Sequence, residues 1–356
     1  MDLPDALSPI PPTLADVAQL AGVSAKTVAR ALNGEAHVRP ETRERIMAAA
    51  AALRFRPNRL ARDLRKGSRS GTVALVIGGL DNPFYSQLAA GVDQGLRGQD
   101  LPLLIASTDD DAEREAVIVG ALLERRVSAL LLVPVSADHG YLAGERQLGT
   151  PVVFLDRPPV NLAADTVLWD DRGCVHEAVA RLAALGHRRI GAVVDSLGLF
   201  TARDRLAAFR EGLERAGVPA AEDLVVTHVH DVATARAATA RLLAMNRPPT
   251  ALLTFNNRIS VGAVDALVRA RRPLPIIGFD DFDLAEPLGL SIVQNDPRRM
   301  GLEGVRIALH RMASGPGRPV ELRIPSRLVL RGSERLGPGG PVDLLAPRPG
   351  VVPAQG

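Results

Sequence analysis

The sequence predicts an α/β protein with a small helical unit at its N-terminus, followed by two doubly wound α/β subdomains. Three observations predict this fold class. Residues 14–33 have the apolar spacing of two short helices joined by a glycine turn. After residue 71, nine strand-like apolar runs alternate with amphipathic segments of helix length. A chain of 356 residues, 46% of them hydrophobic, is also long enough to bury more than one core.

The spacing of apolar and small residues in 14–33 predicts a helix-turn-helix motif. In such a motif the second helix enters the DNA major groove. Gly22 suits the turn because glycine tolerates positive φ, and Ser24 is a good N-cap for the second helix. The predicted shared apolar face consists of Val17, Leu20, Val23, Val28 and Leu32. An ordinary solvated helical hairpin has a similar pattern, so the motif alone leaves both interpretations open.

The exposed start of the second helix is where a recognition helix contacts base edges. Lys26 can donate to guanine O6 and N7, which predicts a preference for a G·C pair at one position. The residues predicted to contact the major groove are Ser24, Ala25, Lys26, Thr27, Arg30, Asn33 and His37.

The charge of the N-terminal segment also favours DNA. Residues 13–69 contain twelve Lys or Arg and five Asp or Glu, whereas the whole chain has a net charge of only +3. The basic segment therefore precedes a nearly neutral body. Such a segment can neutralise phosphates, and its affinity for DNA should depend strongly on salt.

A third helix is predicted from Pro40 to about Leu53, because proline suits the first helical position and Glu41 lies in the first turn. Its predicted contacts with the first two helices are Ile46, Ala49, Ala50 and Leu53. Asn58 can then cap a short helix that runs to about Leu64, before a stretch of Gly, Ser and Arg typical of a linker.

Nine apolar runs after residue 71 are predicted as strands. They are residues 72–77, 101–107, 129–133, 151–155, 166–169, 189–194, 224–229, 251–255 and 275–279. Their alternation with helical segments indicates parallel sheets, and nine strands suit two sheets better than one. Ligands bind such sheets at the carboxyl ends of the strands.

Taken together, these segments resemble the LacI/GalR (lactose-repressor) family of bacterial transcription regulators. The matching strings include TLADVAQLAGVSAKTVARALNG, HVRPETRERIMAAAAALRFRPNRLARDL, NPFY, VVFLDR, ALGHRRIG, ARDRLAAFREGL, GFDDFDLA and LSIVQNDPRRMG. The resemblance runs from Thr13 to about Arg335. It implies a helix-turn-helix DNA-binding head, a hinge helix and a two-subdomain core like that of periplasmic sugar-binding proteins.

The resemblance implies the boundaries of the head, the hinge and the core, and a composition rich in Pro and Gly predicts the disordered tail. The expected parts are a disordered start (1–12), the head (13–57), the hinge helix and linker (58–70), the effector-binding and dimerisation core (71–335) and a disordered tail (336–356). Within the core, the first subdomain would comprise residues 71–169 and 296–319, and the second would comprise residues 170–295 and 320–335.

Asn58, Arg59, Ala61 and Leu64 are in register with the hinge helix of the family. A helix of about nine residues is unstable alone in water, so the hinge should order only when two copies pack together in the minor groove. Leu64 would then wedge between base steps and kink the duplex. A plain flexible linker is the alternative interpretation.

Nine positions are predicted to line the cleft for a small-molecule effector, because each follows a strand or begins a helix. They are Asn82, Phe84, Tyr85, Asp109, Asp156, Thr201, Arg205, Asn256 and Asp280. Arg157 accompanies Asp156 after the fourth predicted strand. Arginine and aspartate side chains that face each other suit hydrogen bonds with sugar hydroxyls or a carboxylate. Each of these residues could instead form a surface ion pair or an ion pair between subdomains.

Several positions depart from the family pattern. Ala29 replaces a serine that binds phosphate, Asn257 replaces an aspartate, and Val232 stands where several members place a stacking aromatic ring. We therefore expect an effector poorly suited to ring stacking, with a sugar or sugar derivative as the leading class. The alternatives are a nucleoside, a carboxylate or a weak effector response.

The predicted function is that of a DNA-binding repressor that acts as a homodimer on a palindromic operator, without a cofactor. A solute-binding protein is the first rival, but Met1–Pro12 does not resemble an export signal, so we expect a cytoplasmic protein. An enzyme is the second rival. The chain lacks GxGxxG, GxxxxGK[ST] and GxSxG motifs, its seven histidines form no metal pattern, and its single cysteine excludes an intramolecular disulfide.

Overall fold

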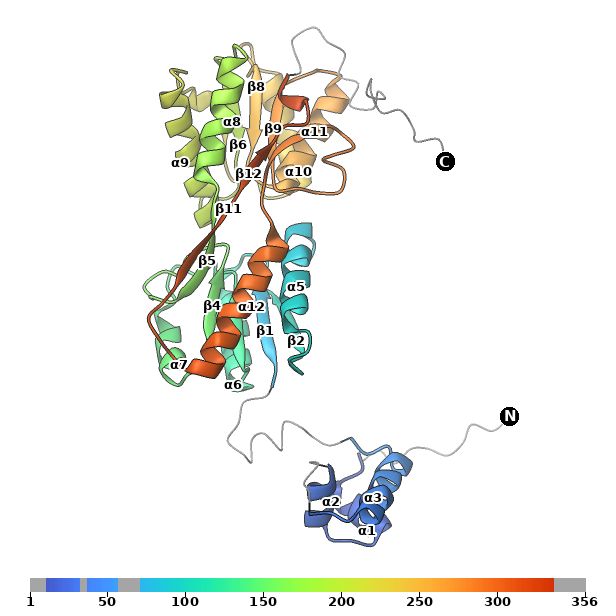
Figure 1. Ribbon diagram of the computed structural model, residues 1–356. Helices are drawn as coiled ribbons and strands as arrows, with labels where there is room; N and C mark the ends of the chain where they lie inside the picture. Colours follow the sequence, from blue (N-terminus) through green and yellow to red (C-terminus); the bar gives the residue numbers. More distant parts are fainter. Residues whose placement is uncertain (1–10, 33–36, 57–70, 336–356) are drawn as a thin grey trace, which may run out of the picture. The chain divides into compact units, whose positions relative to one another are not determined.

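The computed structural model describes residues 11–32, 37–56 and 71–335 (Figure 1). Two compact units divide at residue 70, and each is described by itself. The predicted hinge residues Asn58, Arg59, Ala61 and Leu64 lie outside the described residues, as does Asn33.

Three helices form the N-terminal unit. They are α1 (Leu14–Ala21), α2 (Ala25–Leu32) and α3 (Pro40–Ala52). Gly22 follows α1 with a φ of 65°, which confirms the predicted turn. The Thr27 N–H donates to Ser24 Oγ over 3.2 Å, which confirms the predicted N-cap of α2. Pro40 lies in the first turn of α3, and Arg39 before it makes no side-chain capping bond.

Small aliphatic side chains form the core of this unit. Val17, Val28 and Ile46 are fully buried where the three helices meet. The prediction for Leu20 was wrong, because its exposed fraction is 57%. The buried face of α1 is centred on Val17, Ala18 and Ala21, and Leu20 projects roughly 100° around the helix from that centre.

Residues 71–335 form two six-stranded sheets. The first has the order β11-β5-β4-β3-β1-β2, with β1 (Val73–Ile77), β2 (Leu103–Ser107), β3 (Ala129–Leu132), β4 (Val152–Leu155), β5 (Asp165–Asp170) and β11 (Glu321–Pro325). The second has the order β12-β10-β9-β8-β6-β7, with β6 (Ile190–Val193), β7 (Val225–Val226), β8 (Ala251–Thr254), β9 (Ile276–Phe279), β10 (Ser291–Gln294) and β12 (Arg327–Val329). Every described pairing is parallel except that of β10 with β12, which agrees with the predicted doubly wound architecture.

Helices cover both faces of each sheet. The first sheet packs against α5 (Pro83–Leu96) and α12 (Pro297–Ser314) on one face and α6 (Ala112–Glu124) on the other. The second packs against α8 (Arg172–Ala184) and α9 (Phe200–Arg215) on one face and α10 (Val232–Leu243) and α11 (Asn257–Ala270) on the other. The short helix α7 (Ala143–Gln147) precedes β4. Among the described residues, no helix combines the length and the apolar character needed to cross a bilayer.

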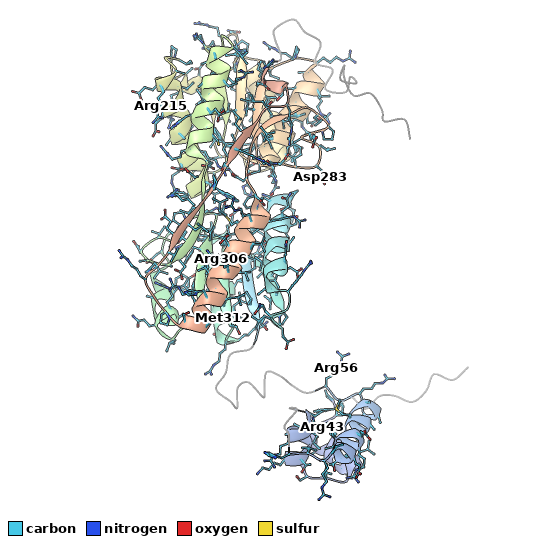
Figure 2. All side chains as sticks on the ribbon, in the orientation of Figure 1. Arg43, Arg56, Arg215, Asp283, Arg306 and Met312 are labelled. Atoms are coloured by element: carbon cyan, nitrogen blue, oxygen red, sulfur yellow. The ribbon has the colours of Figure 1, made fainter. Side chains whose placement is uncertain are left out.

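Two glycines allow α5 and α12 to pack closely, although the helices are far apart in the sequence (Figure 1). A Cβ on Gly91 would collide with the Arg298 carbonyl, and one on Gly301 would collide with the Leu88 carbonyl. The opposite side of α12 exposes Arg306 and Met312 (Figure 2). The two faces of α12 therefore have separate roles, one in packing and one toward solvent.

The chain passes between the two sheets three times: after β5, after β10, and between β11 and β12. The predicted return to the second subdomain at residue 320 was therefore wrong. Strand β11 pairs in parallel with β5, with Glu321 opposite Thr166, and only Arg327 begins pairing in the second sheet. Figure 1 shows β11 and β12 leading from one subdomain to the other.

Three strands, β10, β11 and β12, were not predicted, and the run 224–229 forms only the two-residue strand β7. The edge strands β11 and β12 are largely exposed, with only Ile324 fully buried. Their sequences therefore lack an apolar run. They become strands because a neighbouring strand supplies backbone hydrogen bonds.

Candidate functional site

One cleft of about 370 Å³ lies where the carboxyl ends of strands from both sheets meet. All nine predicted effector residues line it: Asn82, Phe84, Tyr85, Asp109, Asp156, Thr201, Arg205, Asn256 and Asp280. The loops after β1, β2 and β4 supply one wall, and those after β6, β8 and β9 supply the other. The doubly wound topology thus brings together residues that are distant in the sequence.

Arg157 anchors the wall formed by the first subdomain. Its Nη1 donates to Asp110 Oδ1 over 2.7 Å, and its Nη2 donates to Tyr85 Oη over 3.1 Å. Burial raises the pKa of Tyr85, so its hydroxyl keeps its proton and can donate in turn. This network fixes the guanidinium and the phenol together.

Asp156 lies beside Arg157, with its Oδ2 3.4 Å from Arg157 Nε. Its Oδ1 accepts from Trp169 Nε1 over 2.7 Å, and burial raises the pKa of Asp156. The φ of Asp156 is 67°, a left-handed conformation that turns the chain sharply after β4. Asp156 is therefore a carboxylate with a fixed direction at the end of a strand.

Arg205 has the corresponding role in the second subdomain. Its Nε donates to Asp171 Oδ2 and its Nη1 to the Phe255 carbonyl, both over 2.8 Å. The guanidinium carbon lies 4.2 Å from the centre of the Phe279 ring. Among the described residues, Arg205 Nη2 has no hydrogen-bond partner, so this is the group that Arg205 can offer to a ligand.

Asp280 follows β9 and has a φ of 56°. Its Oδ1 accepts from Asn295 Nδ2 over 3.0 Å. Burial raises the pKa of Asp280 to about 6, since few groups compensate its charge. Perturbed carboxyl groups of this kind gather at functional sites, because a bound ligand can supply the missing donors.

Two contacts join the subdomains at the edge of the cleft. Asn257 Nδ2 donates to Asn82 Oδ1 over 2.9 Å, and Arg258 Nη2 lies 3.3 Å from Asp81 Oδ2. Asn82 Oδ1 also accepts from the Phe84 N–H and so caps α5. The Asn82 side chain therefore caps α5 and also binds a residue of the opposite wall of the cleft.

Sequence reasoning missed several residues of the cleft. Those outside the predicted set include Asp81, Asp110, Asp195, His230 and Arg258. Asp195 and His230 each stand one position after a predicted strand run, which is the signal that could have found them. Val232, interpreted as the counterpart of a stacking aromatic, does not line this cleft, whereas His230 does.

Of the predicted DNA-contacting residues that the structure describes, Ser24, Ala25, Lys26 and Thr27 lie at the start of α2, Arg30 lies one turn on, and His37 lies between α2 and α3. Ser24, Ala25, Lys26, Arg30 and His37 are exposed, and Thr27 is half-buried, with its hydroxyl 2.8 Å from that of Ser24. Lys26 and Arg30 are four residues apart and thus share one face of α2. Arg43 (Figure 2) donates from α3 to the Ala31 carbonyl near the end of α2.

Comparison with known proteins decides the family. Residues 13–58 match bacterial regulatory proteins of the lacI family, and residues 179–334 match a periplasmic binding protein-like domain. A ribose operon repressor from Haemophilus influenzae is 31% identical over 307 residues, which cover 84% of this chain and 92% of the relative. The chain belongs to the LacI family. It is therefore a DNA-binding transcriptional regulator, as the resemblance implied.

Other LacI-family proteins match nearly the whole chain. The HTH-type transcriptional regulator DegA of Bacillus subtilis is 28% identical over 330 residues, which cover 90% of this chain and 97% of DegA. The crystal structure of the lac repressor dimer bound to operator and an anti-inducer superposes with a TM-score of 0.76 at 26% identity, covering 91% of this chain and 99% of that one. The predicted fold class is thus confirmed.

Proposed function

We propose that this regulator is a repressor that binds a palindromic operator as a homodimer, and that a small unphosphorylated sugar in the cleft controls its affinity for DNA. The observation that carries the proposal is one cleft, lined by residues of both subdomains, in a chain whose head is a helix-turn-helix unit. A ligand that bridges the walls can favour one relative position of the subdomains.

Two-fold symmetry supports the dimer, since helix-turn-helix proteins read two half-sites with two recognition helices. The lac repressor structure is a dimer on its operator. In this proposal Lys26 and Arg30 read the major groove, and the hinge residues Asn58, Arg59, Ala61 and Leu64 pair in the minor groove. Spreading the two hinges would release the DNA.

The charges of the cleft favour a neutral effector. Six aspartates line it, against three arginines and one histidine. Each arginine already has a carboxylate partner: Arg157 pairs with Asp110, Arg205 with Asp171, and Arg258 with Asp81. A phosphate or carboxylate would find no uncompensated cation, whereas sugar hydroxyls can donate to the aspartates and accept from the arginines. The volume of the cleft and the ribose repressor among the relatives support a monosaccharide such as D-ribose.

A calorimetric titration tests the effector class. Full-length protein should bind D-ribose, whereas ribose 5-phosphate should bind at least about tenfold more weakly, because its phosphate meets only paired arginines and free carboxylates. Tighter binding of the phosphorylated sugar would contradict the proposed class. D-Ribose should also weaken the binding of operator DNA.

A gel-shift experiment tests the DNA side. The protein should bind DNA from the region upstream of its own coding sequence, with an affinity that falls steeply as salt increases. A flat salt response would contradict recognition dominated by phosphates. An unrelated fragment of equal length is the control for specificity.

We also propose that the protein acts in the cytoplasm, where its DNA target lies, and that it catalyses no reaction. Its family membership supports both points, because the relatives named above are regulators. Recovery of D-ribose unchanged after prolonged incubation with the protein would agree with this view. A new product that depends on the protein would contradict it.

A further inference from the structure

His230 lies in the cleft between β7 and α10, and Asp195 holds its ring. His230 Nδ1 is 3.0 Å from Asp195 Oδ1. A carboxylate only accepts, so Nδ1 carries the proton of this bond. Asp195 is itself fixed, because it accepts from Asn256 Nδ2 over 2.7 Å and from the Ser196 N–H over 2.6 Å. The orientation of the ring is thus set by a residue after β6 and a residue before α11.

Charged groups from several elements face this ring. The hydrogen bond that His230 donates to Asp195 raises the pKa of His230 above its usual 6.5, and the charges of Asp195 and Asp110 act in the same direction. Partial burial and Arg258, in the first turn of α11, act in the opposite direction. Asp280, after β9, lines the same cleft. The His230 ring can therefore be protonated near neutral pH.

The other ring nitrogen, Nε2, has no hydrogen-bond partner within the described part of the chain. Since Nδ1 carries a proton in both states, protonation changes Nε2 from an acceptor to a donor. Donors are the scarcer groups in this cleft, because the aspartates only accept and most of the arginine side-chain nitrogens already have a partner. An additional N–H at this position would match an oxygen of a sugar.

We infer that His230 is a specificity-determining residue, which binds the effector in its protonated form by donating from Nε2 to a ligand oxygen. This inference rests on the proposed function, since it needs an effector in the cleft. Binding then takes up a proton whenever the free ring is neutral. The affinity falls as the pH rises above the pKa of the free ring, by at most about tenfold per pH unit for one proton.

Calorimetry on the full-length protein with D-ribose, between about pH 5.5 and 8.5, tests the inference. The unmodified protein should bind more weakly toward high pH and should take up protons, measured as a binding heat that changes with the ionisation heat of the buffer. His230→Gln retains a donor but cannot titrate, so its affinity should be nearly independent of pH. His230→Phe retains a flat ring without a donor, so it should bind weakly at every pH.

His228→Asn is the matched control. His228 lies two residues away, does not line the cleft, and has a φ of 60°, which asparagine tolerates. This variant should keep the pH dependence of the unmodified protein. Any slope that remains in His230→Gln must come from other groups of the cleft, such as Asp280 and Asp156, because burial raises the pKa of both carboxyl groups.

The two proposals fail in different ways. D-Ribose binding with equal pH dependence in the unmodified protein and His230→Gln would overturn the role of His230 and leave the proposed function intact. Absence of D-ribose binding at every pH would overturn the proposed effector and the inference that rests on it.

Discussion

Asp171 accepts a hydrogen bond from Arg205 over 2.8 Å, and this pair connects the cleft to the first of the three segments that join the subdomains. The second segment is connected similarly, because Asn295 donates to Asp280 over 3.0 Å. Asn295 also accepts from Ser326 of the third segment over 2.5 Å. A ligand that moves Arg205 or Asp280 must therefore displace the segments that set the relative position of the subdomains.

Arg205→Lys should greatly weaken the effector response while operator binding persists. Lysine keeps a positive charge beside buried Asp171 but cannot bind Asp171, the Phe255 carbonyl and a ligand together. Loss of a charge-assisted hydrogen bond of ~1.5–3 kcal/mol should weaken D-ribose binding by about tenfold to a hundredfold. Calorimetry and gel shifts with and without D-ribose measure the two properties.

Arg203→Lys is the control for this experiment, since Arg203 is exposed on the same helix and binds only backbone carbonyls. It should respond like the unmodified protein. An unchanged response in Arg205→Lys would place effector recognition elsewhere.

Ser326→Ala should weaken the coupling between effector and operator without greatly changing the affinity for D-ribose. Ser326 binds Asn295 but does not line the cleft. Coupling free energies are typically about 1–3 kcal/mol, and we expect this variant to lose ~1 kcal/mol of that amount. The measurement compares operator affinity with and without saturating sugar, and an unchanged ratio would show that this hydrogen bond carries no coupling.

Asp280→Asn should stabilise the ligand-free protein and abolish its response to sugar. The pKa of Asp280 in the folded protein, about 6, exceeds its ordinary value of 3.8, so the charged carboxylate destabilises the fold increasingly as the pH rises from 3.8 to about 6, and by a constant amount above that pH. About two pKa units, at ~1.4 kcal/mol each, give a gain of up to about 3 kcal/mol at high pH. Urea unfolding at about pH 5 and pH 8 should show the larger gain at pH 8.

Asp283→Asn is the control, because Asp283 (Figure 2) is exposed on the loop that follows β9. Its stability should stay within about 0.5 kcal/mol of the unmodified protein at both pH values. A gain for Asp280→Asn that is larger at low pH would contradict the assigned direction of its pKa.

Lys26→Ala should relax the base preference at one position in each half-site. Lys26 is exposed at the start of α2, where it can donate to guanine O6 and N7. The discrimination lost should be about 1–3 kcal/mol, measured by gel shifts with operators that differ in single base pairs. Arg45→Ala is the control, because Arg45 is exposed on α3, and this variant should leave the preferred sequence unchanged. An unchanged base preference in Lys26→Ala would contradict the proposed role of Lys26 in reading bases.

The sequence by itself determined the features that depend on neighbouring residues. The turn at Gly22, the cap at Ser24 and the start of α3 at Pro40 each follow from interactions within one or two helical turns. The order of the strands' apolar runs likewise determined the two-sheet architecture and the edge at which the cleft lies.

Only the tertiary structure decided which side chains meet. Strand β11 could not be predicted because its mixed sequence becomes a strand only through hydrogen bonds to β5. In the same way, His230 rather than Val232 lines the cleft because a two-residue strand and the following loop set its position. The bond between His230 and Asp195 joins residues 35 positions apart, so it depends on packing that no local pattern encodes.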